Sequence, residues 1–146
     1  MNPDNLSIQI SIGHCHLELK DYNEALKCFF KVDYLDSKSQ KAWRAIAWCS
    51  FLTGKYDQAR NYYKKVVDNQ PNAQDFLNAG HTEWALQNIK GALNYYQQVV
   101  KMEEGNFNKV QELFDQDVEE LIIAGIEQSE IILMLDQLKY QIDGNS

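Results

Sequence analysis

One motif recurs along this chain at a spacing of 33 or 34 residues. Its copies are LELKDYNEALKCF (residues 17–29), FLTGKYDQARNYY (51–63) and WALQNIKGALNYY (84–96). In each copy an alanine is followed by an aromatic residue and then by a valine at the same intervals; the sets are Ala25-Phe29-Val32, Ala59-Tyr63-Val66 and Ala92-Tyr96-Val99. A period of this length indicates stacked copies of one supersecondary unit.

A second fixed point lies twelve residues before each alanine, at Gly13, Ala47 and Gly80. Small residues at two fixed points, with bulky ones at helical spacing around them, predict two helices that cross closely. The small side chains let the backbones approach, and the aromatic rings fill the adjacent groove. The predicted helix pairs are 4–19 with 22–35, 39–53 with 56–69, and 73–87 with 89–103.

This pattern resembles the tetratricopeptide repeat. Its most complete copy is residues 40–73, in which these residues stand at the family's signature positions: Trp43, Ile46, Ala47, Gly54, Tyr56, Ala59, Tyr63, Val66 and Pro71. The resemblance implies an all-α fold, a right-handed α-solenoid of antiparallel helix pairs, in which residues 1–146 form a single domain.

The other two copies, residues 6–39 and 73–106, match the signature less fully. Their departures are Gln9 for the usual tryptophan, Ile89 for the usual tyrosine, and Ser37 and Glu104 for the closing proline. Together the three copies cover roughly two thirds of the chain, and their constant period is more specific than any single signature residue.

The first residues allow two interpretations. Asn2-Pro3-Asp4-Asn5 stands in the same relation to the repeat at residue 6 as Gln70-Pro71-Asn72 stands to the third copy. It therefore reads as the end of a preceding repeat, and the chain as a segment of a larger scaffold. Alternatively, Pro3 opens the first helix, where proline is favoured.

After Gly105 the repeat pattern ends. Residues 107–124 carry apolar side chains at helical spacing up to a stop of Schellman type at Gly125-Ile126, and a second apolar stripe follows in residues 127–142. This segment lacks the small residues that mark a close crossing. We therefore predict a helix pair within residues 107–142 that packs on the third repeat and closes the solenoid.

The candidate sites for chemistry are weak. In His14-Cys15-His16, successive side chains on a helix point about 100° apart, so the three do not converge on a metal ion. Cys15, Cys28 and Cys49 are predicted to be reduced, buried and without an activating base. There is no phosphate-binding glycine motif. We predict no enzyme activity, no metal site and no cofactor.

The net charge of −7 disfavours binding to nucleic acid or to anionic membranes, which requires clustered Lys and Arg. The longest apolar runs are too short to span a bilayer, and the N-terminus lacks the pattern of a secretory signal. The expected location is cytoplasmic.

In proteins that resemble this family, the first helix of each repeat lines a concave groove that binds peptide segments. Carrying the groove positions onto this chain gives the candidate binding residues Ile10, His14, Lys41, Arg44, Trp48, Phe51, Gln74, Leu77, His81 and Trp84. Trp48, one helical turn from Arg44, is the expected hot spot. The alternative that Trp48 packs between repeats stays open, as does burial of Phe51 and Trp84.

The carboxylate clamp of the chaperone-binding members is missing, because its places hold Ile10, His14, Ala45, Gln74 and Asn78. Binding to the C-terminal tails of heat-shock chaperones is therefore disfavoured. The predicted function is a non-catalytic module that binds a peptide or helix of a partner protein.

Two alternatives to this function remain. One is a small acidic chaperone resembling the translocator chaperones of type III secretion, although their additional N-terminal helix is missing from this sequence. The other is a self-associating module that dimerises through an exposed end repeat.

Overall fold

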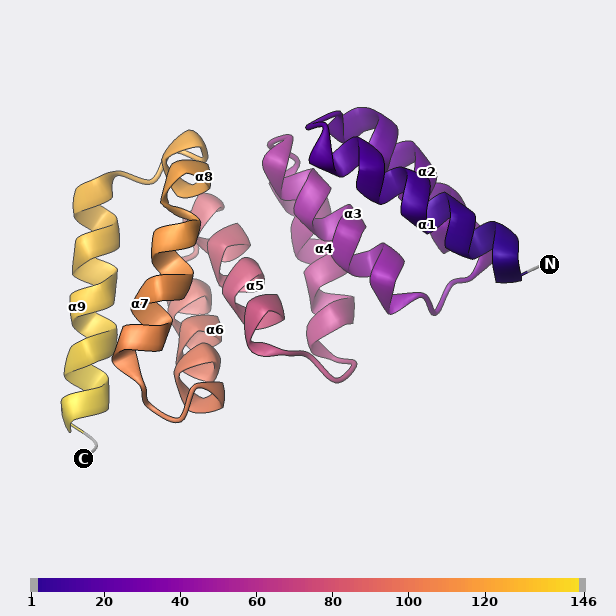
Figure 1. Cartoon of the computed structure of the whole chain (residues 1–146). Helices are drawn as coiled ribbons and strands as arrows, with labels where there is room; N and C mark the ends of the chain where they lie inside the picture. The colour runs from indigo at the N-terminus through magenta and orange to yellow at the C-terminus, as the bar shows by residue number, and fades with distance from the viewer. Residues whose placement is uncertain (1–2, 145–146) are drawn as a thin grey trace. The chain divides into compact units, whose positions relative to one another are not determined.

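The computed structural model describes residues 3–144 of the chain, and the side chains from residue 5 onward (Figure 1). Within this range every regular element is an α-helix. The chain divides into two compact units, Met1–Gln70 and Pro71–Ser146, which we call unit 1 and unit 2.

Unit 1 contains two antiparallel helix pairs, the indigo to magenta helices of Figure 1. Their bounds are α1 (Pro3–Glu18), α2 (Tyr22–Leu35), α3 (Gln40–Leu52) and α4 (Tyr56–Val67). Unit 2 contains a third pair and the C-terminal helices: α5 (Ala73–Ala85), α6 (Ile89–Met102), α7 (Phe107–Gln116), α8 (Val118–Ile123) and α9 (Gln128–Gly144). The prediction of an all-α fold built from helix pairs is confirmed, and each predicted pair lies within two residues of its observed ends.

The helices of a pair cross at the small residues that the repeat places there. A β-carbon added to Gly13 would lie 2.7 Å from the ring of Phe29, and one added to Gly80 would overlap the ring of Tyr96. Both rings are fully buried. The aromatic residue of one helix therefore occupies the space that a side chain on the other helix would need.

In unit 1, α2 packs on α3 through an apolar cluster that includes Leu26, Phe29, Ile46 and Cys49. Beside it, the carboxylate of Asp33 on α2 joins the next two helices. One of its oxygens accepts a hydrogen bond from the indole of Trp43 (3.1 Å) and the other from the hydroxyl of Tyr62 (2.8 Å). Burial and then the bond to Asp33 raise the pKa of Tyr62 to about 12, so its hydroxyl stays a donor at neutral pH.

In unit 2, the core lies among α5, α6, α7 and α9. The ring of Tyr96 on α6 meets the ring of Phe114 on α7 edge-on, with their centroids 4.7 Å apart. Leu121 and Leu138 are also fully buried in this cluster. The C-terminal helices thus complete the hydrophobic core of the third pair.

The C-terminal segment departs from the prediction at one point. We predict one helix up to residue 124, but α7 ends at Gln116 and α8 begins at Val118. Asp117 lies between them with φ −111° and ψ 7°. The predicted stop at Gly125 is confirmed: Gly125 has φ +95°, and the amide of Ile126 donates to the carbonyl of Leu121 (3.0 Å), as in a Schellman motif.

At the beginning of the chain, α1 starts at Pro3, as in the alternative interpretation of this proline. Met1 and Asn2 lie outside the described residues.

The prediction that all three cysteines are buried is wrong for Cys15, which is exposed, while Cys28 is half-buried and Cys49 is buried. The reason is the packing of the equivalent helices. α2 covers Cys49 on α3, but within the described part of unit 1 no helix covers the same face of α1. That face carries the exposed side chains of Ile8, Ile12, Cys15 and Leu19.

Replacing Gly80 by alanine is expected to lower the free energy of unfolding of unit 2 by about 1–3 kcal/mol, because the new β-carbon must displace a ring that Phe114 holds in place. Urea unfolding followed by circular dichroism measures the loss. Gly144→Ala is the control, since a β-carbon there meets nothing within 4 Å. Equal stabilities of the two variants would contradict the close crossing.

Candidate functional site

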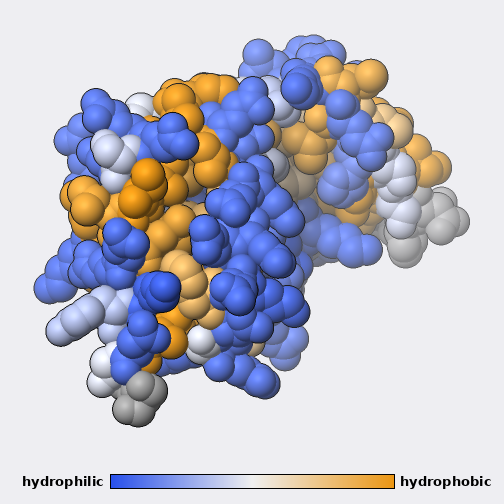
Figure 2. Space-filling view, turned by 60° about the vertical axis from the view of Figure 1, so that its left-hand side comes forward, coloured by the Kyte–Doolittle hydropathy of each residue, from blue (hydrophilic) through white to orange (hydrophobic). Residues whose placement is uncertain are grey.

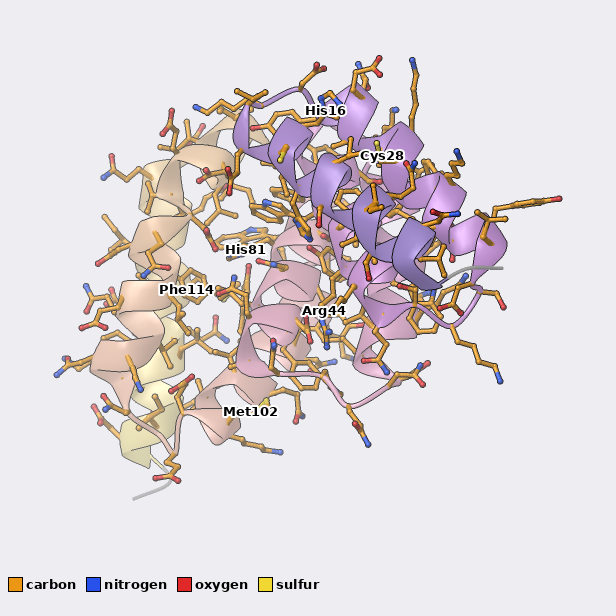
Figure 3. All side chains as sticks on the ribbon, turned by 45° about the vertical axis from the view of Figure 1, so that its right-hand side comes forward. His16, Cys28, Arg44, His81, Met102 and Phe114 are labelled. Atoms are coloured by element: carbon orange, nitrogen blue, oxygen red, sulfur yellow. The ribbon has the colours of Figure 1, made fainter. Side chains whose placement is uncertain are left out.

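The predicted groove residues of unit 1 centre on α3. Trp48 is half-buried, and its ring stacks on that of Phe51 with centroids 5.3 Å apart and planes at 9°. Phe51 is buried and also meets Tyr56, whose ring centroid is 5.5 Å away. Arg44 lies one turn before Trp48 and is half-buried (labelled in Figure 3). Trp48 therefore stacks on one buried ring, which Tyr56 contacts in turn, and it keeps part of its surface exposed.

The remaining candidates of unit 1 lie around this point. Lys41 is exposed at the beginning of α3. On α1, which contacts α3, His14 is exposed and its ring meets Phe29 edge-on at 5.2 Å. Ile10 is half-buried against the apolar cluster between α2 and α3. Five of the six candidates in unit 1 thus keep solvent-accessible surface, and Phe51 does not.

The candidates on α5 are placed differently. Gln74 is exposed, and its amide donates a hydrogen bond to the side-chain oxygen of Asn78 (3.0 Å). Leu77, His81 and Trp84 are buried. Figure 3 shows His81 pointing toward Phe114 of α7, and the two ring centroids are 5.5 Å apart. The repeat register predicts where these side chains lie on α5. It does not predict that the C-terminal helices cover Leu77 and His81.

His81 is the centre of a buried polar network. Its Nδ1 lies 2.7 Å from the hydroxyl of Tyr96, and its Nε2 lies 2.9 Å from a carboxylate oxygen of Asp117. A carboxylate only accepts hydrogen bonds, so Nε2 of His81 is the donor to Asp117. Burial, with the charge of Asp117, raises the pKa of Tyr96 well above its usual value, which keeps that hydroxyl protonated.

This network joins α5, α6 and the junction between α7 and α8. His81 and Tyr96 have no exposed surface, so a substrate in solution does not reach them. A histidine next to an aspartate also occurs in catalytic sites, but here the pair is buried. The three side chains instead connect the segments that carry them. Sequence reasoning missed this role, because Asp117 is 36 residues from His81.

Within residues 3–144, no group of three or more His, Cys, Asp or Glu side chains is placed to hold a metal ion. None of the described helices is both long enough and apolar enough to cross a membrane.

Sequence models of the tetratricopeptide repeat match residues 6–39, 40–73 and 76–106, which together are more than half of the chain. The chain belongs to the tetratricopeptide repeat family. The resemblance drawn from the repeat is thus confirmed.

Among curated proteins, the chain is similar to the tetratricopeptide repeat-containing protein trd-1 of Caenorhabditis elegans. The two are 24% identical over 94 residues, which are 63% of this chain and 12% of trd-1. The chain thus matches only a small part of the length of that relative.

Several solved structures share the fold. PcrH in complex with the chaperone binding region of PopB superposes with a TM-score of 0.68 and 16% identity, over 82% of this chain and 97% of that one. The first tetratricopeptide domain of Spaghetti (RPAP3), bound to the HSP90 peptide SRMEEVD, gives 0.67 and 20% over 80% and 95%. MamA gives 0.68 and 13% over 96% and 81%. At these identities the likeness concerns the fold alone.

Removing the carboxylate of Asp117 is expected to destabilise unit 2 by about 1–3 kcal/mol, because Asp117→Ala leaves Nε2 of His81 buried without its partner. The side chain of Asp117 makes no cap bond to α8, so the loss reports on the histidine. Asp115→Ala on α7 removes the same charge from an exposed position and is the control. If both variants unfold at the same urea concentration, the network does not stabilise unit 2.

Proposed function

We propose that this chain is a non-catalytic protein-interaction module that binds a peptide or helix of a partner protein on the face formed by α1 and α3. The residues in this face are Ile10, His14, Lys41, Arg44 and Trp48, with Phe51 as the buried support. The observation that carries the proposal is the stack of Trp48 on Phe51, one turn from Arg44. On the third repeat, Gln74 is the exposed candidate.

The stack favours binding for a physical reason. A tryptophan held against a buried ring has few conformations to lose when a ligand covers it, so little side-chain entropy opposes binding. Tryptophan and arginine also dominate the residues that carry binding energy at protein interfaces. Lys41 and Arg44 add positive charge to this face of an acidic chain, which favours a ligand that presents carbonyl or carboxylate oxygens beside an apolar anchor.

The comparisons support the class of ligand. RPAP3 holds a peptide of HSP90, and PcrH holds a region of PopB. In each case a tetratricopeptide domain binds a segment of another protein. Because trd-1 is much longer than its matched segment, the likeness to it supports a role as one module of a larger scaffold.

A second candidate function is that of a small acidic chaperone of the translocator type. The net charge of −7 and the likeness of fold over 97% of the PcrH chain favour it. A chaperone keeps an aggregation-prone segment soluble, whereas a scaffold binds a segment that is already soluble. Co-expression with candidate partners separates the two, since only a chaperone client precipitates without this chain.

Self-association is the remaining alternative, through the exposed face of α1. Light scattering at two protein concentrations distinguishes it from the binding of a peptide by a monomer. Alkylation of Cys15, which lies in that face, should then slow as the protein concentration rises.

Peptides selected from a random library on the purified chain are expected to bind Trp48→Ala at least tenfold more weakly, as is usual when a hot-spot tryptophan is truncated. Fluorescence anisotropy of a labelled peptide measures the affinity, and circular dichroism shows that the variant is folded. Tyr34→Ala, which removes an aromatic ring that is 87% exposed on α2, is the matched control. Unchanged affinity for Trp48→Ala would exclude this face as the binding site.

The HSP90 peptide SRMEEVD is expected not to bind, because the clamp positions hold Ile10, His14, Ala45, Gln74 and Asn78, and the last two are hydrogen-bonded to each other. The same anisotropy assay tests this, with the first tetratricopeptide domain of RPAP3 as the positive control. Saturable binding to this chain at comparable concentrations would show that other residues replace the clamp.

A further inference from the structure

Unit 2 carries a groove outside the proposed α1–α3 face, and of the residues predicted from the repeat register Trp84 lines it. It consists of two adjacent hollows of about 380 and 180 Å³, which share Trp84, Ile89 and Glu130 as lining residues. The groove lies between the α5–α6 turn on one side and the α8–α9 loop with the first turns of α9 on the other. Figure 2 turns the α9 side of unit 2 forward and shows hydrophobic patches on that face.

The smaller hollow is mainly apolar, whereas the larger one also exposes polar groups, and the polar side chains in the lining are Gln87, Gln137 and Glu130. Trp84, Ile126 and Met134 are buried at its base, whereas Ile89 is 58% and Leu133 68% exposed. Glu130 is the one charged residue that lines either hollow. A few polar groups in a mostly apolar concavity are typical of ligand sites, and exposed apolar side chains gathered in one place mark interaction surfaces.

The second repeat shows why the groove is open. Phe51 occupies the repeat position of Trp84, and the rings of Trp48 and Tyr56 lie over it in unit 1. In the third repeat the residue equivalent to Trp48 is His81, which is turned into the core by its two hydrogen bonds. Ile89 stands where the family has tyrosine. The two rings that contact Phe51 in the second repeat therefore have no equivalent beside Trp84 in the third.

The carboxylate of Glu130 is held in place at the beginning of α9. Its Oε2 accepts a hydrogen bond from the backbone amide of Glu127 (3.0 Å). Apart from Lys109 and Lys139, all charged side chains in residues 107–144 are acidic. On the α8–α9 side of the groove the charge therefore favours cations over anionic ligands, while the α5–α6 side carries the exposed Lys90 next to Ile89.

We propose that this groove binds a segment of a partner protein that carries large apolar side chains next to a lysine or arginine. The apolar side chains enter the hollows beside Trp84 and Leu133, and the cation pairs with Glu130. The ligand differs in charge from the one expected at α1 and α3, where Lys41 and Arg44 are cationic. The chain thus has a second binding surface of opposite electrostatic character, and neither surface depends on the other.

The test is a random-peptide selection on the full chain that carries Arg44→Ala and Trp48→Ala, so that binding to α3 does not compete. The enriched peptides are expected to combine apolar residues with Lys or Arg. On the chain without these substitutions, such a peptide should shift the indole NMR signal of Trp84 and leave that of Trp48 in place. Signals are assigned with single Trp→Phe variants.

Two pairs of variants locate the contacts. Leu133→Asp should weaken the selected peptides at least tenfold, whereas Ile132→Asp, an exposed neighbour that lines neither hollow, should not. Glu130→Gln keeps an acceptor for the amide of Glu127 and should weaken binding severalfold, with less dependence on salt. Glu112→Gln on α7 is its control, because it removes the same charge from another exposed position.

The outcomes separate this inference from the proposed function. Three results would contradict the groove proposal: selected peptides that bind the Leu133→Asp chain as well as the parent, selected peptides without basic residues, or no enriched peptides. None of these results bears on the α1–α3 face. Conversely, peptides selected on the unsubstituted chain are tested for unchanged affinity to Trp48→Ala. That result would contradict binding at the α1–α3 face and would not affect the groove proposal.

Discussion

The structure depends on one steric constraint, the close crossing of the two helices in each repeat. Phe29 and Tyr96 fill the volume that a side chain at Gly13 or Gly80 would occupy, so each pair locks as a small residue against an aromatic ring. Burial of that ring fixes the rotation of both helices about their axes. The rotation in turn decides which side chains face the neighbouring pair and which face solvent. The exposed surfaces are therefore set by an aromatic residue that is itself fully buried.

Each unit adds hydrogen bonds between side chains to this apolar packing, partly buried in unit 1 and buried around His81 in unit 2. In unit 1 the carboxylate of Asp33 joins Trp43 and Tyr62, and in unit 2 His81 joins Tyr96 and Asp117. Apolar packing tolerates a small slip between helices, but a hydrogen bond between buried groups does not, since a broken one leaves its members unsatisfied. These side chains explain why aromatic and charged residues recur between the helices of this repeat protein.

Sequence was sufficient for the helix pairs, because their signal is local and occurs three times. It was insufficient where a contact joins distant segments. The apolar spacing through Phe114 and Val118 predicts one continuous helix, yet the chain breaks at Asp117, whose carboxylate bonds to His81 36 residues away. The same packing buries Leu77 and His81, which the repeat register places among the groove positions. Cys15 has the repeat position of Cys49, but among the described residues no helix covers that face of α1.

Comparing one repeat position in the two units shows how a common scaffold acquires different surfaces. In the second repeat, the rings of Trp48 and Tyr56 both contact that of Phe51, and Trp48 lies one turn from Arg44. In the third repeat, histidine replaces the first of these rings and isoleucine the second. The histidine turns inward to bond Tyr96 and Asp117, and the space it leaves beside Trp84 becomes a groove with an acidic edge. The replacement of Trp48 by His81 and of Tyr56 by Ile89 thus preserves the helix crossing. It leaves a groove with an acidic edge where the second repeat has an aromatic stack beside a cation. Signature residues conserve the scaffold, while the positions beside them determine what it binds.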